Sequence, residues 1–222
     1  MIRALIFDLD GTLIDSAQDI FRAAASVLDA EGLPSISFEQ SRSFIGRGAR
    51  VFVERMERAV TGSNDARRTD HLHRLFVTAY ERAHETTRIY PHVPETLAQL
   101  QGAGLRLGLC TNKPIGPARA VLAHLGWADL FEEVIGGDSL SVCKPNPEPL
   151  LAVVEGMGLD LAQTVYIGDS ETDAATAEAA GACFGLYTEG YRKTAPEEIF
   201  HHFRFNDYRQ LPGRLERLGR AA

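Results

Sequence analysis

The sequence contains little cysteine, no long apolar run and no excess of positive charge. Its three cysteines, Cys110, Cys143 and Cys183, stand singly without Cys-x-x-Cys spacing, so neither a zinc site nor a disulfide framework is indicated. No apolar run reaches the length of a membrane span, and the first residues differ from a signal peptide because an acidic pair comes early. The formal net charge of -7 gives no reason to expect nucleic acid or a bilayer as a partner. We therefore expect a cytoplasmic protein that binds neither.

What the chain does contain is an ordinary globular composition. Its 222 residues are 45% hydrophobic and 24% charged. This length fits one large domain or a core with a smaller insert, and either arrangement can bury an apolar interior. We expect a monomer or a homodimer.

Short apolar runs recur along the chain, each followed by a turn-rich polar cluster and then a helix-like pattern. Continuous apolar runs are typical of strands that are buried on both faces. The strand-like runs lie at 4–7, 105–110, 133–137, 164–169 and 182–187, and the helix-like patterns at 94–103, 115–126, 147–157 and 172–180. This alternation predicts an α/β fold with a doubly wound, parallel, Rossmann-like sheet.

About ninety residues separate the first two strand patterns, far more than a crossover helix needs. The intervening segment has no convincing strand pattern, but helical periodicity is present within 20–28 and again within 72–79. We expect residues 16–85 to form a small helical cap domain, inserted into a core domain made of 1–15 and 86–222.

The first strand pattern ends in the stretch FDLDGTLIDS, which places Asp8 and Asp10 one residue apart. Successive strand residues point to opposite faces, but beyond the strand end Gly11 lets the backbone curl, so both carboxylates can turn toward one point. Two anions held that close repel each other unless a cation lies between them. A polar strand end that simply enters a turn would show the same pattern, so the other segments must decide.

Three further polar clusters follow later strand patterns. Taken one at a time, each has a structural explanation, because the pair at 111–112 or Asp169 could cap a helix and Lys144 could be a solvated loop residue. Ligands of open parallel sheets, however, bind outside the carboxyl ends of the strands. Separate structural explanations do not account for four clusters at the same edge, which are Asp8, Asp10, Gly11 and Thr12; Thr111, Asn112 and Lys113; Lys144; and Asp169, Ser170 and Asp173.

Together the clusters contain the groups that phosphoryl transfer requires: a nucleophile in line with the leaving oxygen, a proton donor, and positive charge around the equatorial oxygens. Three carboxylates, Asp8, Asp169 and Asp173, with a backbone carbonyl nearby, suit a hard cation such as Mg²⁺. Lys144 supplies a compact positive charge, and the loop at 111–112 supplies hydrogen-bond donors.

The four clusters resemble the four motifs of the haloacid dehalogenase-like hydrolases. They read D-x-D-G-T at 8–12, T-N-K at 111–113, K-P-x-P at 144–147 and G-D-S-x-x-D at 168–173, in the order of the family and over nearly the whole chain. The resemblance implies an enzyme of this superfamily.

The resemblance also implies a role for each motif residue. Asp8 would be the nucleophile that forms an aspartyl-phosphate, and Asp10 the general acid and base. Mg²⁺ would be held by Asp8, the carbonyl of Asp10, and Asp169. The other residues are Thr111, Asn112 and Lys144, which would bind the phosphoryl group, and Ser170 and Asp173 in support, Asp173 by orienting Lys144 and the waters of the metal.

The acid at position 10 narrows the class, because dehalogenases of the superfamily lack it. Within the phosphatases, FIGRGAR at 44–50, TNKP at 111–114 and KPNPEPLL at 144–151 are similar to the phosphoglycolate phosphatase family. The resemblance implies a small phosphorylated metabolite as substrate, with phosphoglycolate as the leading candidate. A sugar phosphomutase or a pyrophosphatase on the same core is the alternative enzyme, and a non-catalytic phosphate-binding protein is the alternative from another class.

Substrate choice is expected to depend on the cap. A compact substrate with a carboxylate needs a cation opposite the phosphate site, and in FIGRGAR the residues Gly46 and Gly48 permit a tight loop from which Arg47 could reach the anion. Arg50, about one turn into the following helix, is the second choice. The alternative is that Arg47 is a solvated loop residue and that the glycines only cap helices.

Overall fold

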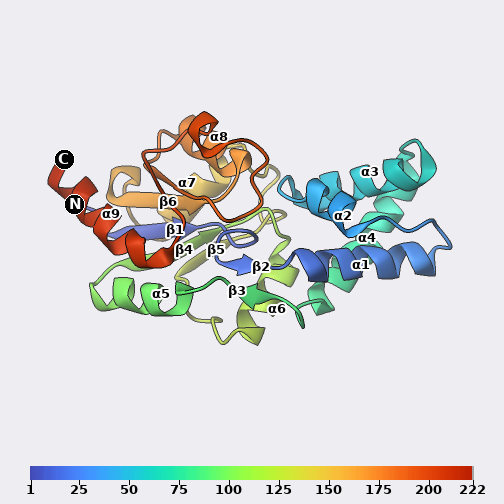
Figure 1. The fold of residues 1–222 in the computed structure, drawn as a ribbon, viewed down its shortest axis with the longest axis horizontal. Coiled ribbons are helices and arrows are strands. Elements are labelled where there is room, and N and C mark those ends of the chain that lie inside the picture. The colour runs from blue at the N-terminus through green and yellow to red at the C-terminus, as the bar shows by residue number, and fades with distance from the viewer. Residues whose placement is uncertain (222) are drawn as a thin grey trace.

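The computed structural model describes residues 1–221, and a six-stranded parallel sheet forms its centre (Figure 1). The strand order β5-β4-β1-β6-β7-β8 confirms the doubly wound arrangement, because the chain adds strands on one side of β1 and then on the other. The strands are β1 (Ala4–Phe7), β4 (Arg106–Cys110), β5 (Glu133–Ile135), β6 (Thr164–Gly168), β7 (Phe184–Tyr187) and β8 (Phe203–Phe205).

The edge strand β8 is the one strand of this sheet that the sequence did not predict. It has three residues, and the middle one, Arg204, is exposed. A short edge strand with a charged outward residue leaves no continuous apolar run to recognise.

The four expected core helices are confirmed within about two residues, and a fifth follows at the C-terminus. They are α5 (Val93–Gly102), α6 (Ile115–His124), α7 (Glu148–Gly156), α8 (Glu171–Ala180) and α9 (Leu211–Ala221). The helix α6 ends earlier than expected, where Gly126 turns the chain with a φ of 73°. Among the helices of residues 1–221, none is long and apolar enough to cross a membrane.

The central strand β1 is fully buried and divides the interior into two apolar clusters. Leu5 and Phe7 point into one cluster, to which α5, α6 and α9 contribute. Ala4 and Ile6 point into the other, which α7 and α8 cover. Figure 1 shows α5 and α8 on opposite sides of the sheet. Burial on both faces explains why this strand reads as a continuous apolar run.

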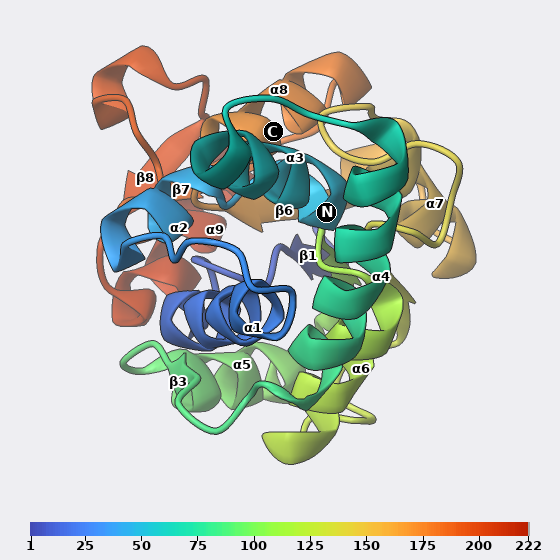
Figure 2. The same ribbon diagram turned by 90° about the vertical axis from the view of Figure 1, so that its right-hand side faces the viewer.

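Four helices lie together beyond one end of the sheet and share a third apolar cluster (Figures 1 and 2). They are α1 (Ala17–Ala30), α2 (Phe38–Phe44), α3 (Gly48–Thr61) and α4 (Ala66–Arg82). In α2 the helix begins with a capping box, in which Ser37 accepts from the backbone N–H of Gln40 and the Gln40 side chain accepts in return. These helices fall within the segment 16–85, whose limits as a separate domain remain a prediction.

The two chain segments that lead into and out of these helices are paired with each other. The strands β2 (Ile14–Asp15) and β3 (Arg88–Ile89) form an antiparallel pair, which the sequence did not predict because each has two residues. Beyond this pair, the Asp19 carboxylate accepts from the backbone N–H of Thr86 and from the hydroxyls of Thr86 and Thr87, at 2.6–3.2 Å. The entry and exit of the helical segment are therefore held side by side.

Candidate active site

The residues to which the sequence assigned a role in the site, except the second-choice Arg50, line a single cavity of about 370 Å³. The parallel register explains this convergence, because Phe7 of β1 lies beside Leu109 of β4 and Ile167 of β6, so the polar residues that follow emerge at one edge. The volume is within the range of a small-molecule site. The lining includes Asp8, Asp10, Gly46, Arg47, Gly48, Thr111, Asn112, Lys144, Asp169, Ser170 and Asp173.

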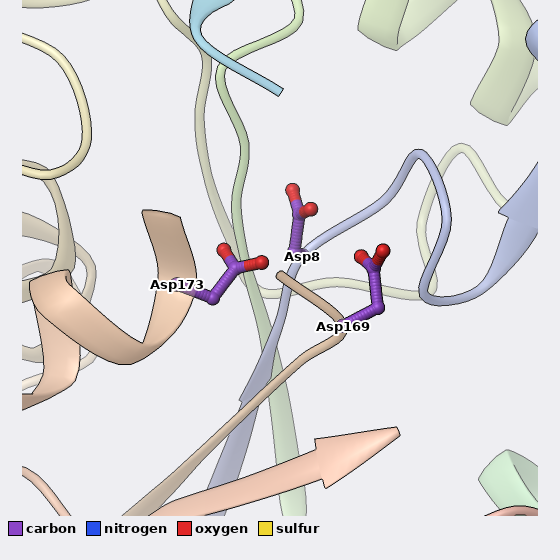
Figure 3. A group of neighbouring side chains, drawn as sticks. All are labelled: Asp8, Asp169 and Asp173. Atoms are coloured by element: carbon purple, nitrogen blue, oxygen red, sulfur yellow. The ribbon is translucent and has the colours of Figure 1, made fainter. Parts of the chain in front are cut away.

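Three carboxylates that line the cavity lie close together (Figure 3). One oxygen each of Asp8, Asp169 and Asp173 lies within 4.8 Å of the others, and all three side chains are buried. Burial raises the pKa of Asp8 to about 7, with Lys144 opposing and Asp173 adding to the rise. Burial, followed by the charges of Asp173 and Asp8, also raises the pKa of Asp169 well above its ordinary value. The cluster thus carries a charge repulsion that a cation would relieve.

Lys144 supplies part of the compensating charge. Its Nζ lies 2.6 Å from Oδ1 of Asp173 and 3.0 Å from Oδ1 of Asp8, and it also donates to the Tyr166 hydroxyl and the Cys110 carbonyl. Burial acts to lower the pKa of this lysine, but the two carboxylates outweigh burial and raise it. The ammonium is therefore charged and fixed by contacts on several sides.

Further donors hold Asp173 and Asp169. Ser170 is the N-cap of α8 in a capping box, in which its hydroxyl accepts from the backbone N–H of Asp173 and the Asp173 carboxylate accepts from the backbone N–H of Ser170. The Ser170 hydroxyl also donates to Oδ2 of Asp173 at 2.6 Å. Asp169 accepts from the Thr12 hydroxyl at 2.8 Å and from the backbone N–H of Tyr191 at 2.6 Å. The start of α8 thus caps the helix and holds the Asp173 carboxylate at the same time, while donors from two other segments hold Asp169.

Two glycines let the backbone pass directly against Asp169. Gly11 has a φ of 92°, and a Cβ there would lie 2.5 Å from Oδ2 of Asp169. A Cβ on Gly190 would lie 2.3 Å from the same oxygen. A side chain at either position would displace the carboxylate.

Asn112 reaches the site through Lys144. Its Oδ1 accepts from the backbone N–H of Lys144 and its Nδ2 donates to the Lys144 carbonyl, both at 2.9 Å. The same Nδ2 donates to the carbonyl of Gly46 in the loop before α3, at 3.2 Å. Thr111 is buried beside it at the end of β4, and its hydroxyl accepts from the backbone N–H of Lys113. The Asn112 side chain therefore connects the backbone at Lys144 to the loop at Gly46 in the cap.

Asp10 is surrounded by three donors from three separate segments. Oδ1 accepts from the Ser16 hydroxyl at 2.6 Å and from Nζ of Lys113 at 3.1 Å. Oδ2 accepts from the Tyr80 hydroxyl of α4 at 3.1 Å. Lys113 also donates to the Tyr80 hydroxyl, and burial lowers the pKa of this lysine although Asp10 opposes the effect. The two carboxylates of the first motif therefore have different partners: Asp8 pairs with Lys144 and Asp10 pairs with Lys113.

The cap side of the cavity is largely apolar. Its wall comes from Ile20, Ile45, Phe52 and Phe76. Arg47 lines the same cavity as the exposed N-cap residue of α3. The glycines on either side of Arg47 have φ values of 116° and 83°, which the sequence anticipated for a tight loop.

Two further cations of this region differ in their placement. Arg50 is not among the lining residues and instead pairs with Glu54 and Asp70 on the surface. Lys193, which sequence reasoning missed, lines the cavity from the loop after β7, and its Nζ donates to the backbone carbonyl of Ser43 at 2.6 Å. Lys193 therefore connects the core to the cap beside Arg47.

Sequence reasoning also missed Tyr80 and Tyr191. Tyr191 lines the cavity, and its hydroxyl accepts from the backbone N–H groups of Ser16 and Ala17 while donating to Asp15. Tyr191 ends the stretch TEGY at 188–191, which could have been noticed because it directly follows the strand pattern at 182–187, as the four polar clusters follow theirs. Tyr80 had no such signal, because an aromatic residue on the buried face of a helix reads as core.

Comparison with known proteins agrees with this geometry. A family model described as a haloacid dehalogenase-like hydrolase matches residues 2–181. Proteins named phosphoglycolate phosphatase from Cereibacter sphaeroides and Rhodobacter capsulatus are 42% and 43% identical to this chain, and the matches cover 96% and 97% of it and 98% of each relative. A crystal structure described as a predicted phosphoglycolate phosphatase from Haemophilus somnus has a TM-score of 0.89 at 30% identity, over 96% of this chain and 98% of that one. The chain belongs to the haloacid dehalogenase-like hydrolase family.

Proposed function

We propose that this hydrolase is a Mg²⁺-dependent phosphatase of small phosphate monoesters, with phosphoglycolate as its substrate. The observation that carries the proposal is the pairing of each carboxylate of the opening motif with its own buried lysine inside one cavity. A nucleophile and a separate acid are what ester hydrolysis through a covalent intermediate needs. The name shared by relatives that are about 42% identical over nearly the whole chain supports the same substrate.

Asp8 is the nucleophile in this proposal. Lys144 holds its Oδ1 at 3.0 Å, which orients the other oxygen for attack on phosphorus. The same ammonium would stabilise the negative charge on the phosphoryl oxygens as the aspartyl-phosphate forms. The hydroxyl and amides at 111–112 would add hydrogen-bond donors to that group.

Asp10 is the general acid and base. It would give a proton to the leaving alkoxide and then take one from the water that hydrolyses the aspartyl-phosphate. Its carboxylate lies on the side of the cavity where α4 approaches, whereas Asp8 faces the core. This separation supports different roles for the two residues.

The residues present fit Mg²⁺. A buried group of carboxylate oxygens is the donor set this ion prefers, and Asp8, Asp169 and the backbone carbonyl of Asp10 would hold it. Bound Mg²⁺ would neutralise charge on the phosphoryl oxygens. Asp173 is already engaged with Lys144 and with Ser170, so it would orient the lysine.

For the substrate's carboxylate, the proposal relies on Arg47 at the cap side of the cavity. A planar guanidinium can bind a carboxylate with two hydrogen bonds. The test is a screen of the purified protein against a panel of phosphorylated metabolites, ranked by kcat/KM. Phosphoglycolate at the top of the ranking supports the proposal. Isomerised sugar phosphate instead of released phosphate would point to a mutase, and no Mg²⁺-dependent phosphate release from any substrate would contradict an enzyme.

A further inference from the structure

A cap residue, Tyr80, touches the residue to which the proposed function assigns proton transfer. Tyr80 lies near the end of α4, 70 positions away from Asp10 in the sequence, and is 5% exposed. Its hydroxyl donates to Oδ2 of Asp10 at 3.1 Å. On the core side, Lys113 contacts both partners, since its Nζ lies 3.1 Å from Oδ1 of Asp10 and also donates to the Tyr80 hydroxyl.

We propose that Tyr80 and Lys113 are positioning residues that hold the Asp10 carboxylate in the orientation needed for proton transfer to the leaving group. The inference rests on the proposed function, in which Asp10 is the acid and base. It adds that a residue of the cap takes part in preparing that acid.

The contacts fix both oxygens of Asp10. Oδ1 is held by Ser16 at 2.6 Å and by Lys113, while Oδ2 is held by Tyr80 and, at 3.4 Å, by Lys113 again. A carboxylate held at one oxygen can still rotate about its terminal bond, whereas one held at both oxygens cannot. Because proton transfer requires the acid within hydrogen-bond reach of the leaving oxygen, a small rotation of this group would slow the reaction.

The ring of Tyr80 is itself firmly placed. It packs against Phe76 with ring centroids 5.5 Å apart, and the ammonium of Lys113 lies 3.7 Å from the centroid of the Tyr80 ring. A cation over an aromatic face is attracted to it. The hydroxyl is therefore directed at Asp10 by packing on one side and by a charge on the other.

The three donors do not belong to the same part of the molecule. Ser16 precedes α1, Lys113 follows β4, and Tyr80 is carried by α4. A movement of α4 away from the sheet would remove one donor from Asp10 and leave the other two in place. The acid is thus completely held only in the arrangement seen here, with α4 against the cavity.

The decisive variant is Tyr80→Phe, which removes the hydroxyl and keeps the ring. Single-turnover rates of alcohol release would be measured on a series of phosphate monoesters, from phosphoglycolate to p-nitrophenyl phosphate. Protonation matters most for poor leaving groups, so we expect the rate to fall about 10-fold for phosphoglycolate and less than about 3-fold for p-nitrophenyl phosphate, with KM unchanged. Lys113→Met should show the same dependence on the leaving group. Tyr187→Phe, which removes the hydroxyl of a tyrosine buried in the core, is the matched control and should leave all rates unchanged.

A double-mutant cycle shows whether Tyr80 acts through Asp10. Adding Tyr80→Phe to Asp10→Asn should cost nothing more, because the group that Tyr80 positions is already lost. Equal losses on every leaving group, or full additivity with Asp10→Asn, would show that Tyr80 is merely structural. If Asp10→Asn alone slowed all substrates equally, the acid role in the proposed function would be wrong, and this proposal would fall with it.

Discussion

The core side and the cap side of the cavity are built in opposite ways. On the core side, Asp8, Asp169, Asp173 and Lys144 are at most 7% exposed, and every one of them has a charged or hydrogen-bonding partner. On the cap side the wall is apolar, and the cation that lines it, Arg47, is an exposed residue at a helix start. Groups held on all sides can carry out a reaction that demands fixed geometry. An exposed cation beside an apolar wall is better suited to selecting among substrates.

The strongest test of the core side is Asp8→Asn. The amide keeps the shape of the side chain but is a poor nucleophile, so we expect turnover to fall by about 10³-fold or more. Phosphate release measures the loss, and circular dichroism checks that the fold is kept. Activity within about tenfold of wild type would show that Asp8 is not the nucleophile. It would also contradict the assignment of the reaction to the core side of the cavity.

Removal of divalent metal tests the carboxylate cluster as a unit. We expect EDTA to reduce phosphate release by at least about 10²-fold and added Mg²⁺ to restore it, because Lys144 only partly compensates the repulsion among the three buried carboxylates. Ca²⁺, which is larger and takes looser geometry, should not restore activity. Full turnover in the chelator would contradict the expected cation.

The cap side is tested by Arg47→Ala. The loss of a charged hydrogen bond to the substrate's carboxylate should lower kcat/KM for phosphoglycolate by about 10 to 100-fold, and should hardly affect p-nitrophenyl phosphate, which has no carboxylate. Arg50→Ala is the matched control, because Arg50 lies on the same helix but pairs with Glu54 and Asp70. Equal losses on both substrates would place Arg47 on the phosphate side instead.

The smallest expected effect concerns the connection between the two sides. Asp19→Ala removes the acceptor of four hydrogen bonds from Thr86 and Thr87 and should lower the free energy of unfolding by about 1 to 3 kcal/mol. Asp29→Ala, an exposed aspartate on the same helix, is the control and should change little. Urea unfolding monitored by circular dichroism measures both.

This effect should depend on pH in a defined direction. Burial acts to raise the pKa of Asp19, but the donated hydrogen bonds outweigh burial and lower it. A carboxylate with a lowered pKa in the folded state stabilises the protein above its unfolded pKa of about 3.9 and loses that contribution as the pH falls through the folded value. The gap between wild type and Asp19→Ala should therefore be full near pH 7 and narrow below about pH 4.

The core side of the site was predictable from the sequence because its polar residues come directly after the strand patterns. Asp8, Asp169 and Thr111 each come directly after a buried apolar run, and parallel pairing then brings the ends of those runs to one edge. The strand β8 escaped prediction because its middle residue faces solvent. The strands β2 and β3 were not predicted because a strand of two residues is too short to show an alternation of apolar and polar residues.

The contacts across the cavity were not predictable in the same way. Tyr80 reads as one more apolar position on α4, and Lys193 as one more charged residue in a loop, until the fold places them at the site. Lys113 stood inside a recognised motif, but its partner Asp10 was visible only in three dimensions. Pairings between distant segments depend on tertiary packing, which local patterns do not encode.

The pairing of β2 with β3 has a consequence for how such a chain can change. The core itself brings the two ends of the inserted segment together, so the entropy cost of closing that segment grows only with the logarithm of its length. Shortening, lengthening or exchanging the insert would leave the ends where they are, and the sheet would not have to move. For a protein engineer, the paired segments Ile14–Asp15 and Arg88–Ile89 are therefore the positions at which a different cap can be inserted. Such an exchange would change the cap side of the cavity and leave the catalytic residues of the core in place.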